Sequence, residues 1–380
     1  MPLDVERLRR EEFPWAHAGE AVYLDAASTG PLPERTVRAQ DEFTRKRAAP
    51  YRLSHEEQFA VLDDSRALVA ELIGAMPRDI ALAANTGGGL NLAAWGLPLG
   101  ERDVVVVPDL EFPANVYPWM AAATARGFTV HRVRARSGLI DEAAVLATLE
   151  HPGVRVLSLS WVGFSTGVAV ELERIGRACR ERDVWFVVDG IQGVGALPLN
   201  VARAGIDLLA CGAQKWLLSP WGSGFTYVNP RIVDRLTPQP VSWMGVRGSD
   251  DFSTLLDYDL TWRDDARRFE QITLAYQDFA GMAASLGLLR ELGWDEVMRH
   301  IAARTAQLHD GASRAGIPLV TRRDRRAGIV TVRPDDVVAA SSRLKRATVT
   351  HSVREGTIRL APHCYTTPEE IDVALAALTA

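Results

Sequence analysis

The fold is decided by the sequence from Val184 to Val228, which reads VWFVVDGIQGVGALPLNVARAGIDLLACGAQKWLLSPWGSGFTYV. This stretch contains strand candidates at 184–188, 207–210 and 224–228, separated by polar and glycine-rich segments. The first run is continuously apolar rather than alternating, which is typical of strands covered on both faces of a sheet. The stretch therefore predicts neighbouring strands of a buried, mostly parallel sheet.

Similar runs lie upstream of this stretch and alternate with segments of helical periodicity. Further strand candidates are found at 80–83, 104–107, 128–133 and 154–160. Leu172, Ile175 and Cys179 fall at helical spacing between two of the candidates, as do parts of 141–149. This alternation predicts an α/β domain built on a mostly parallel sheet of about seven strands.

The pattern changes after about residue 250. A long apolar helix is predicted over 277–292, followed by a second helical stretch through His309 and by short strand candidates at 328–332 and 356–360. Thr367, Pro368 and Glu370 form a capping box with proline at the first helical position. We therefore expect a large domain over 21–250, a smaller α+β domain over 251–380, and an N-terminal segment, 1–20, that packs with the small domain.

Composition and charge exclude several classes of protein. The chain has 380 residues, is 47% hydrophobic and carries a formal net charge of -5, so nothing in its electrostatics favours nucleic acid as a partner. The first twelve residues lack the apolar core of a signal peptide. No apolar run reaches the roughly 18–20 residues of a membrane helix. We expect a cytoplasmic protein without a membrane partner.

The cysteines and histidines predict neither disulfides nor a metal site. Cys179, Cys211 and Cys364 are widely spaced and form no C-x-x-C pair. The histidines contain no H-E-x-x-H arrangement, so a zinc site is unsupported.

Two polar residues follow strand candidates, where ligands bind in an open parallel sheet. Asp189 comes directly after 184–188, and its carboxylate could pair with a protonated ring nitrogen or act as a helix cap or turn residue. Lys215 follows 207–210 among tryptophan, leucine and small residues. Burial would lower its pKa and favour the free amine that Schiff-base chemistry needs. The alternative is a lysine that lies over apolar surface.

Two other segments are candidates for holding a cofactor. Consecutive glycines in Asn85-Thr-Gly-Gly-Gly-Leu-Asn91 precede a helical stretch and form either a phosphate cradle or a flexible turn. The segment is neither G-x-G-x-x-G nor a P-loop, which weakens the dinucleotide and nucleoside-triphosphate interpretations. Phe112, in Glu111-Phe-Pro-Ala-Asn115, could stack on a planar ring or belong to the core.

Together these residues closely resemble the class V aminotransferase family, pyridoxal 5′-phosphate (PLP) enzymes that include cysteine desulfurases, kynureninase and isopenicillin N epimerase. The resemblance runs from Tyr23-Leu-Asp-Ala-Ala27 to Thr367-Pro-Glu-Glu-Ile371. Its most specific block is Val187-Val-Asp-Gly-Ile-Gln-Gly193, Gln214-Lys-Trp216 and Gly222-Ser-Gly224. It implies fold type I, the fold of aspartate aminotransferase, and a homodimer with sites at the subunit interface.

The resemblance also implies roles for individual residues. Lys215 would hold PLP as a Schiff base and move the proton at the substrate's alpha carbon, while Asp189 would keep the pyridine nitrogen protonated. Gln192 would hydrogen-bond the phenolic oxygen, and Phe112 would stack on the ring. The phosphate would be bound by Thr86, Gly87 and Gln214 and, across the dimer interface, by Tyr276.

The substrate's carboxylate would bind Arg359, in Thr357-Ile-Arg-Leu-Ala-Pro-His363, through a bidentate fork. Ala27 would lie beside the substrate. A surface ion pair is the alternative role for Arg359.

The chain departs from the family pattern at several positions. Glycines stand at 87 and 88 where many relatives have hydroxyl and acidic side chains, and Phe164 replaces an asparagine that contacts the cofactor in desulfurases. The desulfurase nucleophile is a loop cysteine before the carboxylate arginine, but no cysteine lies between Cys211 and Cys364. Cys364 follows Arg359 and is interpreted as a packing residue.

These observations favour transamination of a small-molecule amino acid. A C–S or C–C lyase or an epimerase is the alternative. A non-catalytic scaffold would be expected to lose Lys215, Asp189 or Arg359, and all three are present. A nicotinamide-dependent oxidoreductase lacks support because the glycine fingerprint is missing.

Overall fold

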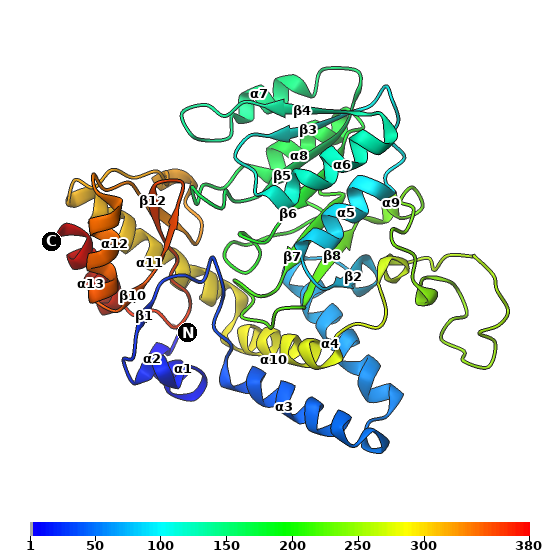
Figure 1. The fold of residues 1–380 in the computed structure, drawn as a ribbon, viewed down its shortest axis with the longest axis horizontal. Coiled ribbons are helices and arrows are strands. Elements are labelled where there is room, and N and C mark those ends of the chain that lie inside the picture. Colours follow the sequence, from blue (N-terminus) through cyan, green and yellow to red (C-terminus); the bar gives the residue numbers. More distant parts are fainter. Residues whose placement is uncertain (1–2) are drawn as a thin grey trace.

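The computed structural model describes residues 3–380, and a seven-stranded sheet lies at the centre of its larger part (Figure 1). The strands follow the order β2-β8-β7-β6-β5-β3-β4. They are β2 (Ile80–Ala83), β3 (Val104–Pro108), β4 (Thr129–Val133), β5 (Val154–Ser160), β6 (Trp185–Asp189), β7 (Leu208–Gly212) and β8 (Gly224–Val228). Only β8 runs antiparallel to its neighbours. The predicted α/β fold with a mostly parallel sheet is confirmed.

The predicted strands agree with the observed ones to within a residue or two at each end. The difference that matters most for the site is at β6, where Asp189 is the last residue of the strand rather than the first residue after it. Asp207 lies just before β7, and its carboxylate accepts a hydrogen bond from Phe186 N–H and pairs with Arg231.

Helices cover both faces of the sheet. On one face, Val187 and Leu208 pack with residues of α5 (Thr86–Gly96) and α6 (Tyr117–Arg126). On the other, Val188 and Leu209 pack with α4 (His55–Ile73), α7 (Glu142–Thr148) and α8 (Leu172–Glu181). Residues that are adjacent in a strand thus belong to different clusters, which explains the continuous apolar runs in the sequence.

The C-terminal part has its own core and a small antiparallel sheet in the order β11-β12-β9. Its elements are α11 (Trp294–Arg314), β9 (Val330–Val332), α12 (Val337–Arg346), β10 (Val349–Thr350), β11 (Ser352–Arg354), β12 (Thr357–Leu360) and α13 (Pro368–Thr379). The capping box that begins α13 forms as predicted, with Thr367 and Glu370 bonded reciprocally.

Segments distant in sequence connect the two parts. β1 (Val22–Tyr23) pairs in parallel with β10, while α10 (Tyr276–Leu292) packs on α3 (Glu34–Ala48) and α4 beside the large sheet. From α1 (Val5–Glu12), Arg9 donates hydrogen bonds to Tyr365 O and to Glu370. The β1–β10 pairing and the packing of α10 cross the boundary near 250, and the contacts of Arg9 also cross the one near 20, so both boundaries stay predictions.

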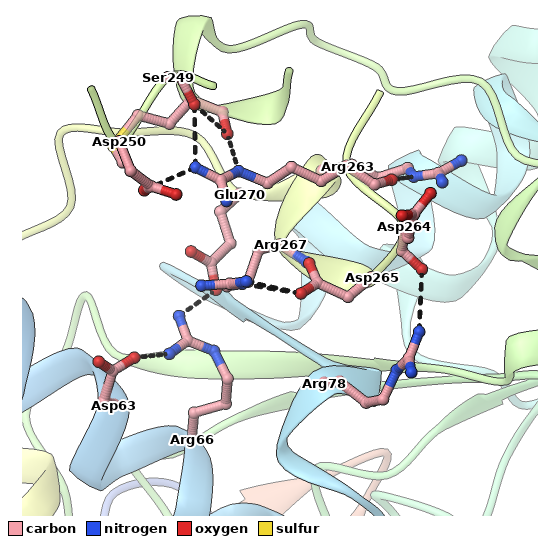
Figure 2. A network of polar contacts seen from close by, with 12 residues as sticks. Asp63, Arg66, Arg78, Ser249, Asp250, Arg263, Asp264, Asp265, Arg267 and Glu270 are labelled. Atoms are coloured by element: carbon pink, nitrogen blue, oxygen red, sulfur yellow. Dashed lines mark hydrogen bonds and ion pairs between the residues drawn. The ribbon is translucent and has the colours of Figure 1, made fainter. Parts of the chain in front are cut away.

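A network of ion pairs fixes the edge of the sheet (Figure 2). Arg66 on α4 donates from Nη2 to Glu270 Oε1 at 2.7 Å, and both side chains are buried. The same carboxylate oxygen accepts from Leu82 N–H at 2.9 Å. Glu270 therefore joins α4 and β2 to the segment before α10, and it fixes the strand that leads into α5.

The segment between α9 (Pro230–Val233) and α10 extends as a long loop away from the rest of the molecule (Figure 1). It exposes apolar side chains, among them Leu256 at 79% and Tyr258 at 90%. Across residues 3–380, the structure contains no helix with the length and apolar character to cross a bilayer.

We predict that Arg66→Ala lowers the free energy of unfolding by about 3–5 kcal/mol, because it leaves the Glu270 carboxylate buried without its hydrogen-bonded cation. The measurement is urea unfolding of the purified protein. Arg78→Ala is the matched control, since Arg78 is exposed and makes one 3.4 Å contact with Asp264 O. Its effect should stay within about 0.5 kcal/mol. Equal losses in both variants would contradict the structural role of the Arg66–Glu270 pair.

Candidate active site

A cavity of about 430 Å³ lies at the carboxyl ends of the parallel strands, beside the β11–β12 hairpin. Its lining brings together every predicted site residue except Tyr276: Ala27, Thr86, Gly87, Phe112, Asp189, Gln192, Gln214, Lys215 and Arg359. Parallel strands end at one edge of a sheet, so residues far apart in sequence meet there.

Two groups of opposite charge are buried together in this cavity. Burial raises the pKa of Asp189 to about 6, opposed by the hydrogen bond from Ile191 N–H and by the Lys215 amine. Burial also lowers the pKa of Lys215 to about 8; Asp189 opposes this change, while Arg359 and Arg354 add to it. The lysine can therefore supply a neutral amine near neutral pH, and the carboxylate is stabilised by a cation beside it.

The backbone around Lys215 is held by segments distant in sequence. Gly30 N–H donates to Gln214 O at 2.8 Å, and a Cβ placed on Gly30 would lie 2.0 Å from Lys215 O. On the other side, the His363 ring packs parallel to Trp216 at 5.7 Å between centroids. Cys364 N–H donates to His363 Nδ1, so Nε2 carries the proton and donates to Trp216 O at 3.1 Å.

Gln192 is oriented by two hydrogen bonds. Its Oε1 accepts from the indole N–H of Trp216 at 3.0 Å, and its Nε2 donates to Ala27 O at 3.0 Å. An amide nitrogen carries two hydrogens, so one donor remains toward the cavity. That donor suits the phenolic oxygen of PLP.

The other end of the cavity is formed by the first turn of α5. Asn85 caps this helix by accepting from Gly88 N–H, and Thr86 Oγ1 accepts from Gly212 N–H at 2.8 Å. Gly89 is needed for close packing, because a Cβ there would lie 2.4 Å from Thr226 Oγ1. Backbone N–H groups and the helix dipole at such a terminus favour a phosphate.

Phe112 forms part of the wall of the cavity. Its side chain is 49% exposed and lies 5.3 Å from Phe164, ring edge to ring face, so the alternative of a core phenylalanine is wrong. The preceding residue, Glu111, is buried and accepts hydrogen bonds from Asn115 Nδ2 and from Ser160 N–H. Glu111 thereby ties the Phe112 loop to the end of β5.

Arg359 is 2% exposed and reaches the cavity from β12. Its Nη1 donates to Phe164 O at 2.8 Å, its Nη2 donates to Ser28 Oγ at 2.7 Å, and Asp25 Oδ1 lies 3.5 Å away. Its Nε is buried and has no hydrogen-bond partner among residues 3–380. Arg359 is buried rather than on the surface, so the alternative of a surface ion pair is wrong, and a guanidinium in the lining of a cavity fits an anionic ligand.

Tyr276 begins α10 and does not line this cavity. Its ring lies 6.4 Å from Phe43 and 6.1 Å from Phe59 between centroids. Its contact with the phosphate of a second subunit stays a prediction.

The three cysteines are all buried, and none lines the cavity. Burial raises the pKa of Cys364 to about 12 and that of Cys179 to about 12, and it raises the pKa of Cys211 as well. A buried thiol held in the protonated form is a poor nucleophile.

The residues present fit PLP. The α5 terminus suits the phosphate, Asp189 the ring nitrogen, Lys215 the aldehyde and Phe112 the ring face. No role was predicted for four residues of the site: Gly30, Glu111, Ser28 and Arg354. The contacts of Gly30, Glu111 and Ser28 join distant segments, and only the string Glu111-Phe-Pro-Ala-Asn115 offered a signal.

Comparisons with known proteins agree with this geometry. The family model for aminotransferase class-V matches residues 22–373. YcbU from Bacillus subtilis, an uncharacterized aminotransferase, is 28% identical over 316 residues, covering 80% of each chain. A probable cysteine desulfurase from Pyrococcus abyssi is 27% identical over 407 residues, covering 100% of this chain and 97% of that one.

The solved structures include C-DES with glycine covalently linked to the PLP cofactor. It matches with a TM-score of 0.88 at 25% identity and covers 98% of both chains. A second structure describes C-DES as a cystine C–S lyase in complex with its product, cysteine persulfide; its TM-score is 0.86 at 25% identity, with coverage of 96% and 99%.

We predict that Gly30→Ala destabilises the protein by about 1–3 kcal/mol, because the new methyl group collides with Lys215 O and the backbone must move. Less PLP should remain bound, as judged by absorbance after gel filtration. Gly287→Ala is the control, since Gly287 lies in α10 with open space around it. A Gly30→Ala protein with the stability and PLP content of the wild type would refute the requirement for close packing of Gly30 against Lys215 O.

Proposed function

This chain belongs to the aminotransferase class-V family of PLP-dependent enzymes, and from that premise we propose that it transfers the amino group of a small-molecule amino acid. The family includes transferases, lyases and epimerases, so family membership alone leaves the reaction open. The proposal therefore rests on the side chains that line the cavity.

When bound, PLP supplies an electron sink that stabilises negative charge at the substrate's alpha carbon. Asp189 would hold the ring nitrogen in its protonated form, and Gln192 would donate its free amide hydrogen to the phenolic oxygen. Lys215 would bind the cofactor and then carry the proton that leaves the alpha carbon, a task that suits an amine with its pKa lowered to about 8.

The observation that carries the proposal is the combination of Arg359 with buried cysteines. Arg359 lines the cavity, and its guanidinium offers a positive charge for the alpha carboxylate of an amino acid. The cavity lacks the thiol that a persulfide mechanism needs, because Cys364 is completely buried. Amino transfer needs only the lysine, the carboxylate and the arginine, and all three line the cavity.

A PLP-dependent lyase is the second candidate, and the likeness to C-DES favours it. Direct elimination, which breaks the bond between the beta carbon and the sulfur of the substrate, also needs no protein thiol. The two candidates differ in whether a 2-oxo acid acceptor is required.

A homodimer also stays a proposal. The exposed apolar side chains of the 241–262 loop support it, since Leu256, Tyr258 and Leu260 are largely uncovered. A second copy that packed there would remove this apolar surface from water.

The reaction is tested by incubating the holoenzyme with single amino acids and identifying the products by mass spectrometry. For an aminotransferase we expect about one equivalent of the 2-oxo acid per site, with multiple turnovers only after a second 2-oxo acid is added. Free ammonia and continuous turnover without an acceptor would instead identify a lyase. Racemised amino acid without a 2-oxo acid would identify an epimerase.

The role of Lys215 is tested by borohydride treatment. We predict that it fixes PLP onto the peptide Gln214-Lys-Trp216 and leaves Lys46 and Lys345, the other lysines of the chain, unmodified. Lys215→Ala should retain PLP non-covalently, should lose the fixed adduct, and should turn over about 10²–10⁴-fold more slowly. PLP fixed at another lysine, or full activity in the variant, would refute the assignment.

A further inference from the structure

The β11–β12 hairpin presents two arginines on the same face. In its antiparallel register Ser352 lies opposite Arg359, and Arg354 lies opposite Thr357. Residues two apart in a strand point to the same side, so Arg354 shares the face of Ser352 and is a diagonal neighbour of Arg359. Both arginines line the cavity that contains Lys215.

The two arginines differ in burial and in partners. Arg359 is buried and held by several oxygen atoms, whereas Arg354 is exposed at the mouth of the cavity. Arg354 Nη1 donates to the neighbouring Val353 O at 2.9 Å. Within residues 3–380, no carboxylate comes within 4 Å of the Arg354 guanidinium to form an ion pair. Its charge is therefore available to a ligand.

Positive side chains outnumber negative ones in the lining of the cavity. Lys215, Arg354 and Arg359 are the cations of its lining, and Asp189 is the only carboxylate among the lining residues described by the structure. Lys215 and Asp189 have roles toward the cofactor, and Arg359 has one toward the alpha carboxylate. Arg354 also lowers the pKa of Arg359, after the larger effect of burial, so the two positive charges act on each other along this face of the hairpin.

We propose that Arg354 binds a second anionic group of the substrate, so that the enzyme selects amino acids whose side chain ends in a carboxylate. This inference rests on the proposed function, because it requires the alpha carboxylate to lie on Arg359. The exposed position of Arg354 suits the distal end of the substrate, which enters last. Phe112 and Phe164 line the same cavity and offer apolar contact to the methylene groups between the two carboxylates.

The test measures binding to the holoenzyme without turnover. Succinate and glutarate lack an amino group and cannot react, and their monoamides, succinamate and glutaramate, remove one negative charge at nearly constant shape. Dissociation constants are obtained by calorimetry. For the wild type we expect the better-fitting diacid to bind roughly tenfold more tightly than its monoamide, because one charge-assisted pair is lost.

In Arg354→Gln the ratio of the two dissociation constants should fall to about one. Arg346→Gln, which removes an exposed positive charge from α12 outside the cavity, is the matched control and should keep the wild-type ratio. Arg359→Gln should weaken the diacid and the monoamide together. Thermal unfolding of each variant verifies that it folds.

A wild-type ratio near one, the same ratio in Arg354→Gln and the wild type, or no binding of either acid would each overturn the inference. Failure of the proposed function is a separate result. If products form without an acceptor while the diacid preference still depends on Arg354, the enzyme is a lyase and the second anion site stands.

Discussion

The active site depends on the burial of a lysine and an aspartate at the ends of neighbouring strands. β6 and β7 are adjacent in the sheet, so the backbone hydrogen bonds between them bring the residue that ends β6 close to the turn that follows β7. Removing both groups from water costs free energy, and each partly offsets the cost to the other. The result is a carboxyl with its pKa raised to about 6 beside an amine with its pKa lowered to about 8.

This pair can act on a ligand only if the lysine is held in place beside the aspartate. Gly30 and His363 hold the backbone on either side of Lys215, and Trp216 extends from it to Gln192. A Cβ on Gly328 would lie 2.3 Å from the Trp216 ring, so the C-terminal part also packs closely on this side chain. The backbone around Lys215 is therefore in contact with the segment that contains Gly30 and with the C-terminal part.

Much of this site could be predicted from the sequence, but the contacts between its distant segments could not. Asp189, Lys215 and the α5 glycines follow apolar runs, and the rule for parallel sheets places them at one edge. The partners of Arg359 come from residues 25–28 and 164, and no periodicity connects these segments to β12. Only glycine fits at position 30, because a Cβ there would collide with Lys215 O. That contact exists only once the chain is folded. Tyr276 shows the same limit, because its predicted role needs a second chain.

Glu111, which holds the Phe112 loop, is electrostatically coupled to Asp189. Burial raises the pKa of Glu111 to about 7, opposed by its hydrogen bonds with Asn115 and Ser160, and the nearby Asp189 charge raises it further. Negative charge on Asp189 therefore disfavours a second negative charge on Glu111, whereas the hydrogen bonds from Asn115 and Ser160 favour it. Electrostatic coupling is reciprocal, so the protonation state of Glu111 acts on the carboxylate that lines the cavity.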